Sequence, residues 1–157
     1  MLIYKELIKS SNKIIYPTSK KDFTFKSLKK KVSIKPLFLK LTYVLYIDNL
    51  KHCRPCIDTF IETFKKQSLL HPNLNYVLIC KNFNEKELDI LINDKNLELP
   101  IYTITNDKSF FLKMMDETSF PFYFTINNSL DISNVFLPSK KRPELNTIYF
   151  NNINENY

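Results

Sequence analysis

The sequence contains no glycine and no tryptophan among its 157 residues. Glycine adopts positive φ more readily than any other residue. Turns that need this conformation must therefore use Asn or Asp, the next most tolerant residues. The pair Asn127-Asn128 and several other Asn-rich breaks fit that expectation.

Long apolar runs are missing as well. No stretch approaches the ~20 apolar residues of a transmembrane helix. Residues 1–16 are interrupted by Lys5, Glu6, Lys9 and Lys13, which argues against a signal peptide there. We therefore expect a soluble body. If the natural protein is exported, its signal or its membrane anchor has been removed from this chain, and the anchor would have held it near a membrane.

The positive charge is concentrated in one part of the chain. The net charge is +7, yet residues 1–40 hold eleven Lys against two acids, and the rest holds slightly more acids than bases. A uniformly basic nucleic-acid binder would not show this division, so we expect no nucleic-acid partner. The basic segment fits either a solvated face or a segment near an anionic membrane surface.

A chain of this length forms one domain with a substantial core. We expect residues 1–36 to be a basic N-terminal extension packed on or beside the domain, with residues 18–31 as an exposed connection, and residues 37–157 to be the domain. Residues 41–47 form an apolar, β-branched run typical of a buried strand. A helix is predicted over 55–66 because apolar residues recur there at i, i+3, i+4 and i+7, namely Ile57, Phe60, Ile61 and Phe64.

Strands and helices continue to alternate toward the C-terminus. Further strands are predicted over 74–80, 122–126 and 132–137, and a short strand or an extended segment is predicted over 100–104. Further helices are expected after Asn84, after Asn106 or Asp107, and from Pro143. Strands that alternate with helices and then form a hairpin indicate an α/β fold with a central mixed sheet flanked by helices.

The tetrapeptide Cys53-Arg54-Pro55-Cys56 lies at the step from the first of these strands to the first helix. There the helix N-terminus and Arg54 stabilise a thiolate, and Pro55 fits the first turn, where a missing N–H costs nothing. Cys53 is then the exposed attacking thiol, and Cys56, one turn inside the helix, is the resolving thiol. A Cys-x-x-Cys in this setting predicts redox chemistry.

Two other interpretations of the cysteine pair stay open. A zinc site would need two further ligands, and only Cys80, His52 and His71 are available, without a second Cys-x-x-Cys. The two cysteines could also be purely structural. We predict that the chain binds neither a metal nor a cofactor.

Residues 37–150 resemble the thioredoxin-fold thiol–disulfide oxidoreductases, nearest the TlpA/ResA-like or redoxin-like proteins of the bacterial envelope found in Bacteroidetes. The Cys-x-Pro-Cys form is common in that group, and residues 119–127 are similar to its cis-proline followed by an apolar strand. The resemblance implies that Pro121 is this cis-proline, since X–Pro bonds lose most of the trans preference. It also implies that Phe120 and Pro121 bind an extended substrate peptide beside the two sulfurs.

The same resemblance implies a reductase of protein disulfides, supplied with electrons by an upstream redox partner and located in the periplasm or cell envelope. A cytoplasmic location is the alternative. Two rival functions stay open. One is a binding or assembly module of the same fold with a vestigial dithiol, and the other is an RNA- or membrane-surface binder that uses residues 1–40.

Several residues near the dithiol have two interpretations. His52 stands where the family usually has Trp, and it could tune the Cys53 thiolate or be an ordinary loop residue. Asp48 could accept a proton from Cys56 or be a solvated loop acid. Cys80 ends an apolar strand, which predicts a buried, inert thiol.

Overall fold

The computed structural model describes residues 16–17, 23–27, 30–32, 40–107, 119–129, 131–137, 141–142 and 144–154. The elements along this part of the chain are β1 (Tyr16–Pro17), β2 (Phe23–Ser27), β3 (Lys30–Val32), β4 (Thr42–Asp48), α3 (Arg54–Leu70), β5 (Asn75–Lys81), α4 (Glu85–Lys95), β6 (Ile101–Asp107), β7 (Phe122–Ile126), β8 (Asp131–Phe136) and α6 (Glu144–Asn154).

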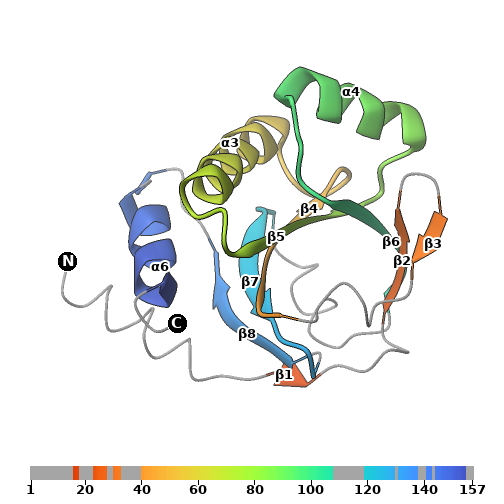
Figure 1. Ribbon diagram of the computed structural model, residues 1–157. Helices are drawn as coiled ribbons and strands as arrows, with labels where there is room; N and C mark the ends of the chain where they lie inside the picture. The colour runs from red at the N-terminus through yellow and green to blue at the C-terminus, as the bar shows by residue number, and fades with distance from the viewer. Residues whose placement is uncertain are drawn as a thin grey trace.

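The strands form one mixed sheet in the order β1-β8-β7-β4-β5-β6-β2-β3 (Figure 1). β4, β5 and β6 run parallel to one another, whereas β7 is antiparallel to β4 and β8 is antiparallel to β7. Because parallel neighbours need a crossover connection, α3 joins β4 to β5 and α4 joins β5 to β6. The predicted α/β fold with a central mixed sheet and flanking helices is confirmed.

Both edges of the sheet receive strands from the N-terminal part of the chain. β1 pairs with β8 at one edge, and the β2–β3 hairpin pairs through β2 with β6 at the other. The prediction that residues 18–31 form only an exposed connection is therefore wrong. Its Lys-rich composition concealed the strands, because strands at or beside the edge of a sheet do not need the continuous apolar pattern of a central buried strand.

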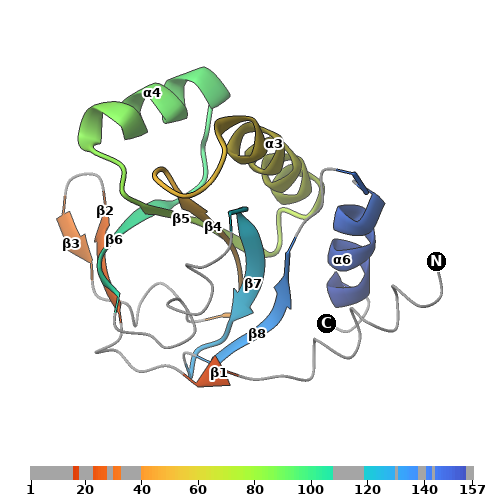
Figure 2. The same cartoon turned by 180° about the vertical axis from the view of Figure 1, so that it is seen from behind.

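One face of the sheet packs against all three described helices, α3, α4 and α6, and Figures 1 and 2 show these helices on the same side. The alternating side chains of β4 explain this arrangement, because Tyr43, Leu45 and Ile47 point to the helices while Val44 and Tyr46 belong to a second apolar cluster on the opposite face. The loop that leads to the cysteine pair therefore follows a strand, β4, in which every residue is buried.

Asparagine takes over the conformational task of the missing glycine. The described residues with positive φ are Asn82, Asn96 and Asn134. The expectation that Asn takes these positions is therefore confirmed. The expectation of positive φ is wrong for the turn at Asn127-Asn128, because neither residue has positive φ. The Asn127 side chain closes that turn by accepting hydrogen bonds from the N–H groups of the residues two and four positions later.

The predicted helix after Asn106 or Asp107 falls on residues 108–118, which lie outside the described residues, and both proposed cap residues belong to β6. Asn84 is confirmed as the cap of α4, where it forms a capping box with Glu87. The C-terminal helix is confirmed as α6, which starts at Glu144.

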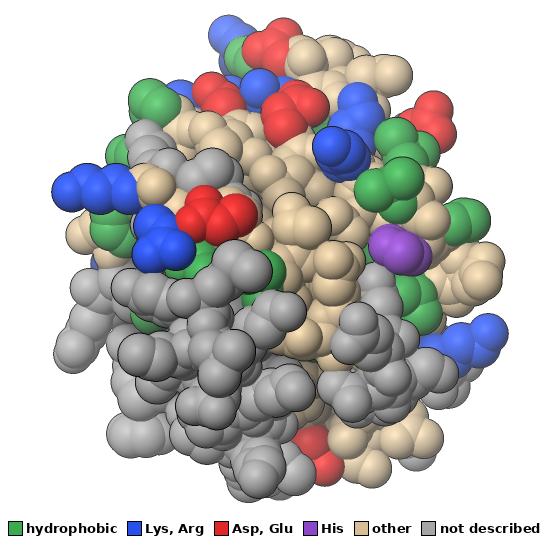
Figure 3. Space-filling view, turned by 90° about the vertical axis from the view of Figure 1, so that its left-hand side faces the viewer, with side chains coloured by type: hydrophobic (Ala, Val, Ile, Leu, Met, Phe, Trp, Pro, Cys, Tyr) green, Lys and Arg blue, Asp and Glu red, His purple; other side chains and the backbone are tan. Residues whose placement is uncertain are grey.

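Charged side chains of both signs are interspersed on the face shown in Figure 3. No helix within the described ranges is long and apolar enough to cross a membrane.

Candidate active site

The cysteine pair lies where β4 passes into α3. β4 ends at Asp48, and after a short loop Cys53 becomes the N-cap residue of α3. Cys53 has the extended backbone conformation of a cap (φ −66°, ψ 137°), and its carbonyl accepts the hydrogen bond from Ile57 N–H at 3.0 Å. Pro55 lies in the first turn, where its missing N–H leaves no helical bond unmade.

Cys53 and Cys56 form a disulfide with their Cα atoms 5.2 Å apart. The two sulfur-bearing residues differ sharply in exposure, since Cys53 is exposed and Cys56 is completely buried. In this geometry a large partner can reach only the sulfur of Cys53. Cys56 can reach only Cys53, which is the arrangement that separates an attacking thiol from a resolving one.

The start of α3 favours negative charge on Cys53. Its Sγ atom accepts a hydrogen bond from the backbone N–H of Cys56 at 3.3 Å, and the first turn of the helix contains no acidic residue. Unpaired N–H groups and the helix dipole stabilise an anion at this position, so a thiolate formed on reduction meets a favourable field.

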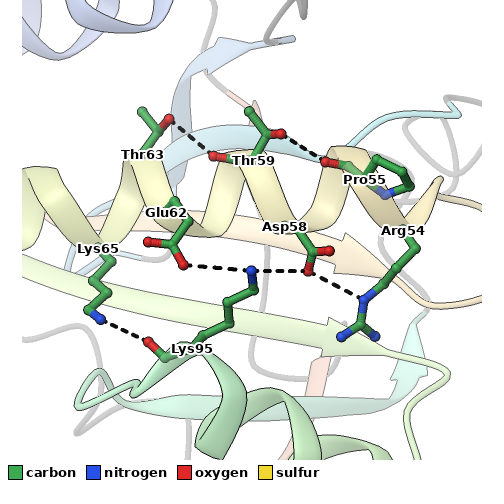
Figure 4. Close-up of polar contacts among 8 residues, drawn as sticks. All are labelled: Arg54, Pro55, Asp58, Thr59, Glu62, Thr63, Lys65 and Lys95. Carbon is green, nitrogen blue, oxygen red and sulfur yellow. Dashed lines mark hydrogen bonds and ion pairs between the residues drawn. The ribbon is translucent and has the colours of Figure 1, made fainter.

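Arg54 contributes less to this field than a lone cation would. Its Nε atom lies 3.3 Å from Oδ1 of Asp58, one turn further along α3, and the Lys95 Nζ of α4 lies 3.5 Å from the same oxygen (Figure 4). Part of the positive charge of Arg54 is thus compensated within the helix.

The loop before Cys53 is held by His52 and Asp48. The buried His52 ring accepts a hydrogen bond at Nδ1 from the backbone N–H of Asp48 (2.9 Å). The backbone N–H of His52 in turn donates a hydrogen bond to the backbone carbonyl of Asp48 (2.9 Å). An accepting Nδ1 carries no proton, so the ring is neutral in this geometry and supplies no positive charge to Cys53. Its edge packs on Tyr46, with ring centroids 6.2 Å apart.

Asp48 is a buried residue, so the interpretation as a solvated loop acid is wrong. Its Oδ1 accepts hydrogen bonds from Leu50 N–H and from Asn82 Nδ2, both at 2.9 Å. Its Oδ2 has no hydrogen-bond partner among the described residues. Asp48 thereby ties the loop after β4 to the loop after β5. The Asp48 side chain is buried because Asp48 is the last residue of a central strand.

The segment before β7 lies at the same end of the sheet as the cysteines, because Tyr46 near the end of β4 pairs with Phe122 at the start of β7. Pro121 is buried and Phe120 is 46% exposed. The prediction of a cis-proline is wrong, since the Phe120–Pro121 bond is trans. An X–Pro bond keeps a trans preference of about 0.5–1 kcal/mol, so a short motif cannot impose the cis form without supporting tertiary contacts.

Cys80, near the end of β5, pairs in register with Ile47 of β4 and is completely buried. Burial raises the pKa of the Cys80 thiol, because an apolar site disfavours the thiolate. Its burial is as the sequence predicted. Within the described residues no group of three or more His, Cys, Asp or Glu could hold a metal ion.

Three contributors to the site were missed by sequence reasoning. The pairing of Arg54 with Asp58 has a local signal, the i,i+4 spacing on one helix. Lys95 and Asn82 have none, because each reaches the site from a different element.

Comparison with known proteins reveals similarity in structure only. No protein-family model matches the chain, and no curated protein sequence matches it. A thiol:disulfide interchange protein from Bacteroides sp. is 14% identical with a TM-score of 0.64, over 85% of this chain and 84% of that chain.

Two further solved structures have the same arrangement. A thiol:disulfide interchange protein of the thioredoxin family from Chlorobium tepidum is 14% identical (TM-score 0.55, 87% of this chain, 97% of that chain). A secreted disulfide oxidoreductase from Mycobacterium tuberculosis is 12% identical (TM-score 0.55, 82% and 94%). At these identities the likeness shows the fold, and the chain has the thioredoxin-like fold that the sequence predicted.

Proposed function

We propose that this thioredoxin-like chain is a thiol–disulfide oxidoreductase that exchanges its Cys53–Cys56 pair with protein thiols and disulfides. One observation supports the proposal above all: an exposed Cys53 caps α3 and is disulfide-bonded to a buried Cys56 one turn inside the helix. Structural neighbours that are described as thiol:disulfide interchange proteins add support.

The exchange proceeds in two displacements. In the reduced protein the Cys53 thiolate attacks one sulfur of a substrate disulfide, a Cys53–substrate disulfide forms, and the other substrate sulfur leaves as a thiolate. Cys56 then loses its proton and attacks the Cys53 sulfur, which closes the internal disulfide and releases the second substrate thiolate. Two electrons pass to the substrate, and the released thiolates take up protons from solvent.

We propose the reductase direction, with an upstream thiol partner that reduces Cys53–Cys56 again. The resemblance of the Cys-x-Pro-Cys motif to reductases supports it. The field at the start of α3 acts in the other direction, since a stabilised thiolate favours the reduced form and so makes the protein more oxidising. The pairing of Arg54 with Asp58 moderates that field.

For substrate binding we propose the apolar residues at the Cys53 end of the sheet, namely the exposed Phe120 and Leu50 and the buried Pro121 that follows Phe120. Leu50 is 78% exposed in the loop between β4 and Cys53, and Phe120 is exposed at the same end of the sheet. Exposed apolar side chains at the same end of the sheet as a reactive sulfur suit an extended, partly apolar peptide. Arg54, Pro55 and His52 are proposed to set the properties of the thiolate, His52 through the loop it holds.

We propose a location in the cell envelope. A structural neighbour described as secreted supports this location, and disulfide chemistry is most common in oxidising compartments.

Trapping of the mixed disulfide tests the proposed function. The Cys56→Ser variant lacks the resolving thiol, so after incubation with a disulfide-bonded protein it should accumulate a covalent adduct that dithiothreitol releases. The matched Cys53→Ser variant keeps only the buried thiols of Cys56 and Cys80 and should form none. A vestigial dithiol predicts equal and negligible adduct for both variants, and that result would reject the proposal.

A further inference from the structure

Four charged side chains form a ladder between α3 and α4 (Figure 4). Arg54 Nε lies 3.3 Å from Asp58 Oδ1, Lys95 Nζ lies 3.5 Å from that same oxygen, and Lys95 Nζ lies 3.6 Å from Glu62 Oε1. We call Arg54, Asp58, Lys95 and Glu62 the charge ladder. Lys65 lies beside it, and its Nζ donates a hydrogen bond to the Lys95 carbonyl at 2.8 Å, which fastens the end of α4 to α3.

The two carboxylates of the charge ladder act against a thiolate on Cys53. At 1.5 Å per residue, Asp58 lies about 7.5 Å and Glu62 about 13.5 Å from Cys53 along the helix axis. The axial spacing to Asp58 is close to one Debye length at physiological salt, roughly 8 Å, so salt weakens the field of Asp58 at Cys53 without removing it.

Lys95 is placed to compensate both carboxylates. Its side chain is 19% exposed, less than those of the three other ladder residues, so solvent screens it least. Oδ1 of Asp58 is buried and has no hydrogen-bond partner in the described part of the chain, where Arg54 and Lys95 are its charge partners. With Lys95 the ladder is neutral, and without it the ladder carries one net negative charge.

We infer that Lys95 is a positioning residue that sets the redox properties of Cys53 from a separate helix. It neutralises Asp58 and Glu62, and so leaves the start of α3 favourable to a thiolate. The inference rests on the proposed function for its meaning, although the effect on Cys53 can be measured without any substrate.

The test compares Lys95→Met with the matched control Lys65→Met. Each variant replaces a lysine that joins α3 to α4 with an uncharged side chain of similar length, but only Lys95 contacts the carboxylates. In the reduced protein Lys95→Met should raise the Cys53 pKa, read from the pH dependence of alkylation, by about half a unit. This is the effect of one charge roughly 10 Å away in water-rich surroundings.

The same change should appear in the redox equilibrium. Above the Cys53 pKa, Lys95→Met should shift the thiol–disulfide equilibrium constant about threefold toward the disulfide, which is about 14 mV more negative at 29.6 mV per tenfold. Lys65→Met should leave both quantities unchanged. The double variant Lys95→Met/Asp58→Asn, whose ladder is again neutral, should return toward the wild-type values.

The inference is overturned if Lys95→Met leaves the Cys53 pKa unchanged, or if Lys65→Met shifts it equally, since both results mean that the lysines only dock α4. Failure of the proposed function looks different. A wild-type protein that exchanges no disulfides but whose Cys53 pKa still responds to Lys95→Met would reject the function and retain the inference.

Discussion

Cys80 belongs to the same apolar cluster as Cys56. Its surroundings disfavour a thiolate, whereas those of Cys53 favour one. Cys53 has a helix N-terminus beside its sulfur, whereas Cys80 is buried in the sheet, and burial raises the pKa of its thiol. A thiol that stays protonated and out of contact with solvent reacts slowly, because the thiolate is the nucleophile.

In the reduced, folded protein we therefore expect iodoacetamide at neutral pH to modify Cys53 fast and Cys80 only after unfolding in urea. Mass spectrometry of peptides from timed samples measures both rates. The Cys80→Ala variant should keep the fast phase. A fast modification of Cys80 in the folded state would contradict its described burial.

At the level of single residues, the sequence predicted the parts of the site that depend on local order. Cys53 and Cys56 could be placed because a strand, a short loop and a helix follow one another within a few residues. Lys95 and Asn82 could not, since each reaches the site across a tertiary contact. The isomer of Pro121 also depends on surroundings that a short motif does not contain.

At the level of elements, β4, β5, β7 and β8 were predicted to within one residue at each end, whereas β6 continues to Asp107, beyond the predicted end at residue 104. The structure has a longer helix than the one predicted over 55–66. α3 runs from Arg54 to Leu70, and His71 is its C-cap residue. The apolar spacing of the helix is lost after Phe64, but the helical backbone conformation continues up to His71, the residue before Pro72. The proline disfavours the helical conformation at His71.

The loop between β4 and α3 shows how elements fix the site. Backbone and side-chain bonds of Asp48 and His52 hold its ends, and Asn82 fastens it to the loop after β5. Asn82 adopts φ 59°, a conformation that glycine would take more easily, but only a side chain can make this bond. The preference for Asn at such turns was predictable, whereas its partner was not.

At the level of the whole molecule, the mixed sheet followed from the order of its central elements. The N-terminal strands did not, because β1 pairs with β8 and β2 pairs with β6, both far away in the sequence, and β3 joins the sheet only through its hairpin with β2. Such pairings leave no short-range pattern, and charged residues are common in edge strands.

The buried ionisable groups of the core predict a loss of stability at alkaline pH. Burial raises the pKa of Tyr76 from 10.0 to about 12, raises that of Cys80 above its ordinary 9.0, and raises those of Tyr123 and Tyr149. The unfolded chain gives up these protons first. Stability is therefore complete below the unfolded pKa values and falls as the pH rises through them.

We expect the urea midpoint of the oxidised protein to be level from pH 7 to about 8.5 and to fall above it. The fall should be steeper beyond pH ~10, where the tyrosines join at up to ~1.4 kcal/mol per pH unit and group. The disulfide between Cys53 and Cys56 does not titrate, so it does not contribute. Cys80→Ala should delay the onset toward pH ~10, and a midpoint level up to pH ~11 would refute the linkage.

The central claim is that Cys53 and Cys56 form a reversible redox couple, and a redox titration tests it most directly. The folded protein is equilibrated in glutathione buffers of graded ratio, and its free thiols are labelled with a reagent of known mass. We predict one reversible two-electron transition, nearer the about −270 mV of thioredoxin than the about −120 mV of a strong disulfide oxidant. A potential near the latter value would contradict the reductase direction. A Cys53–Cys56 pair that neither opens nor closes across the whole range would contradict the redox function itself.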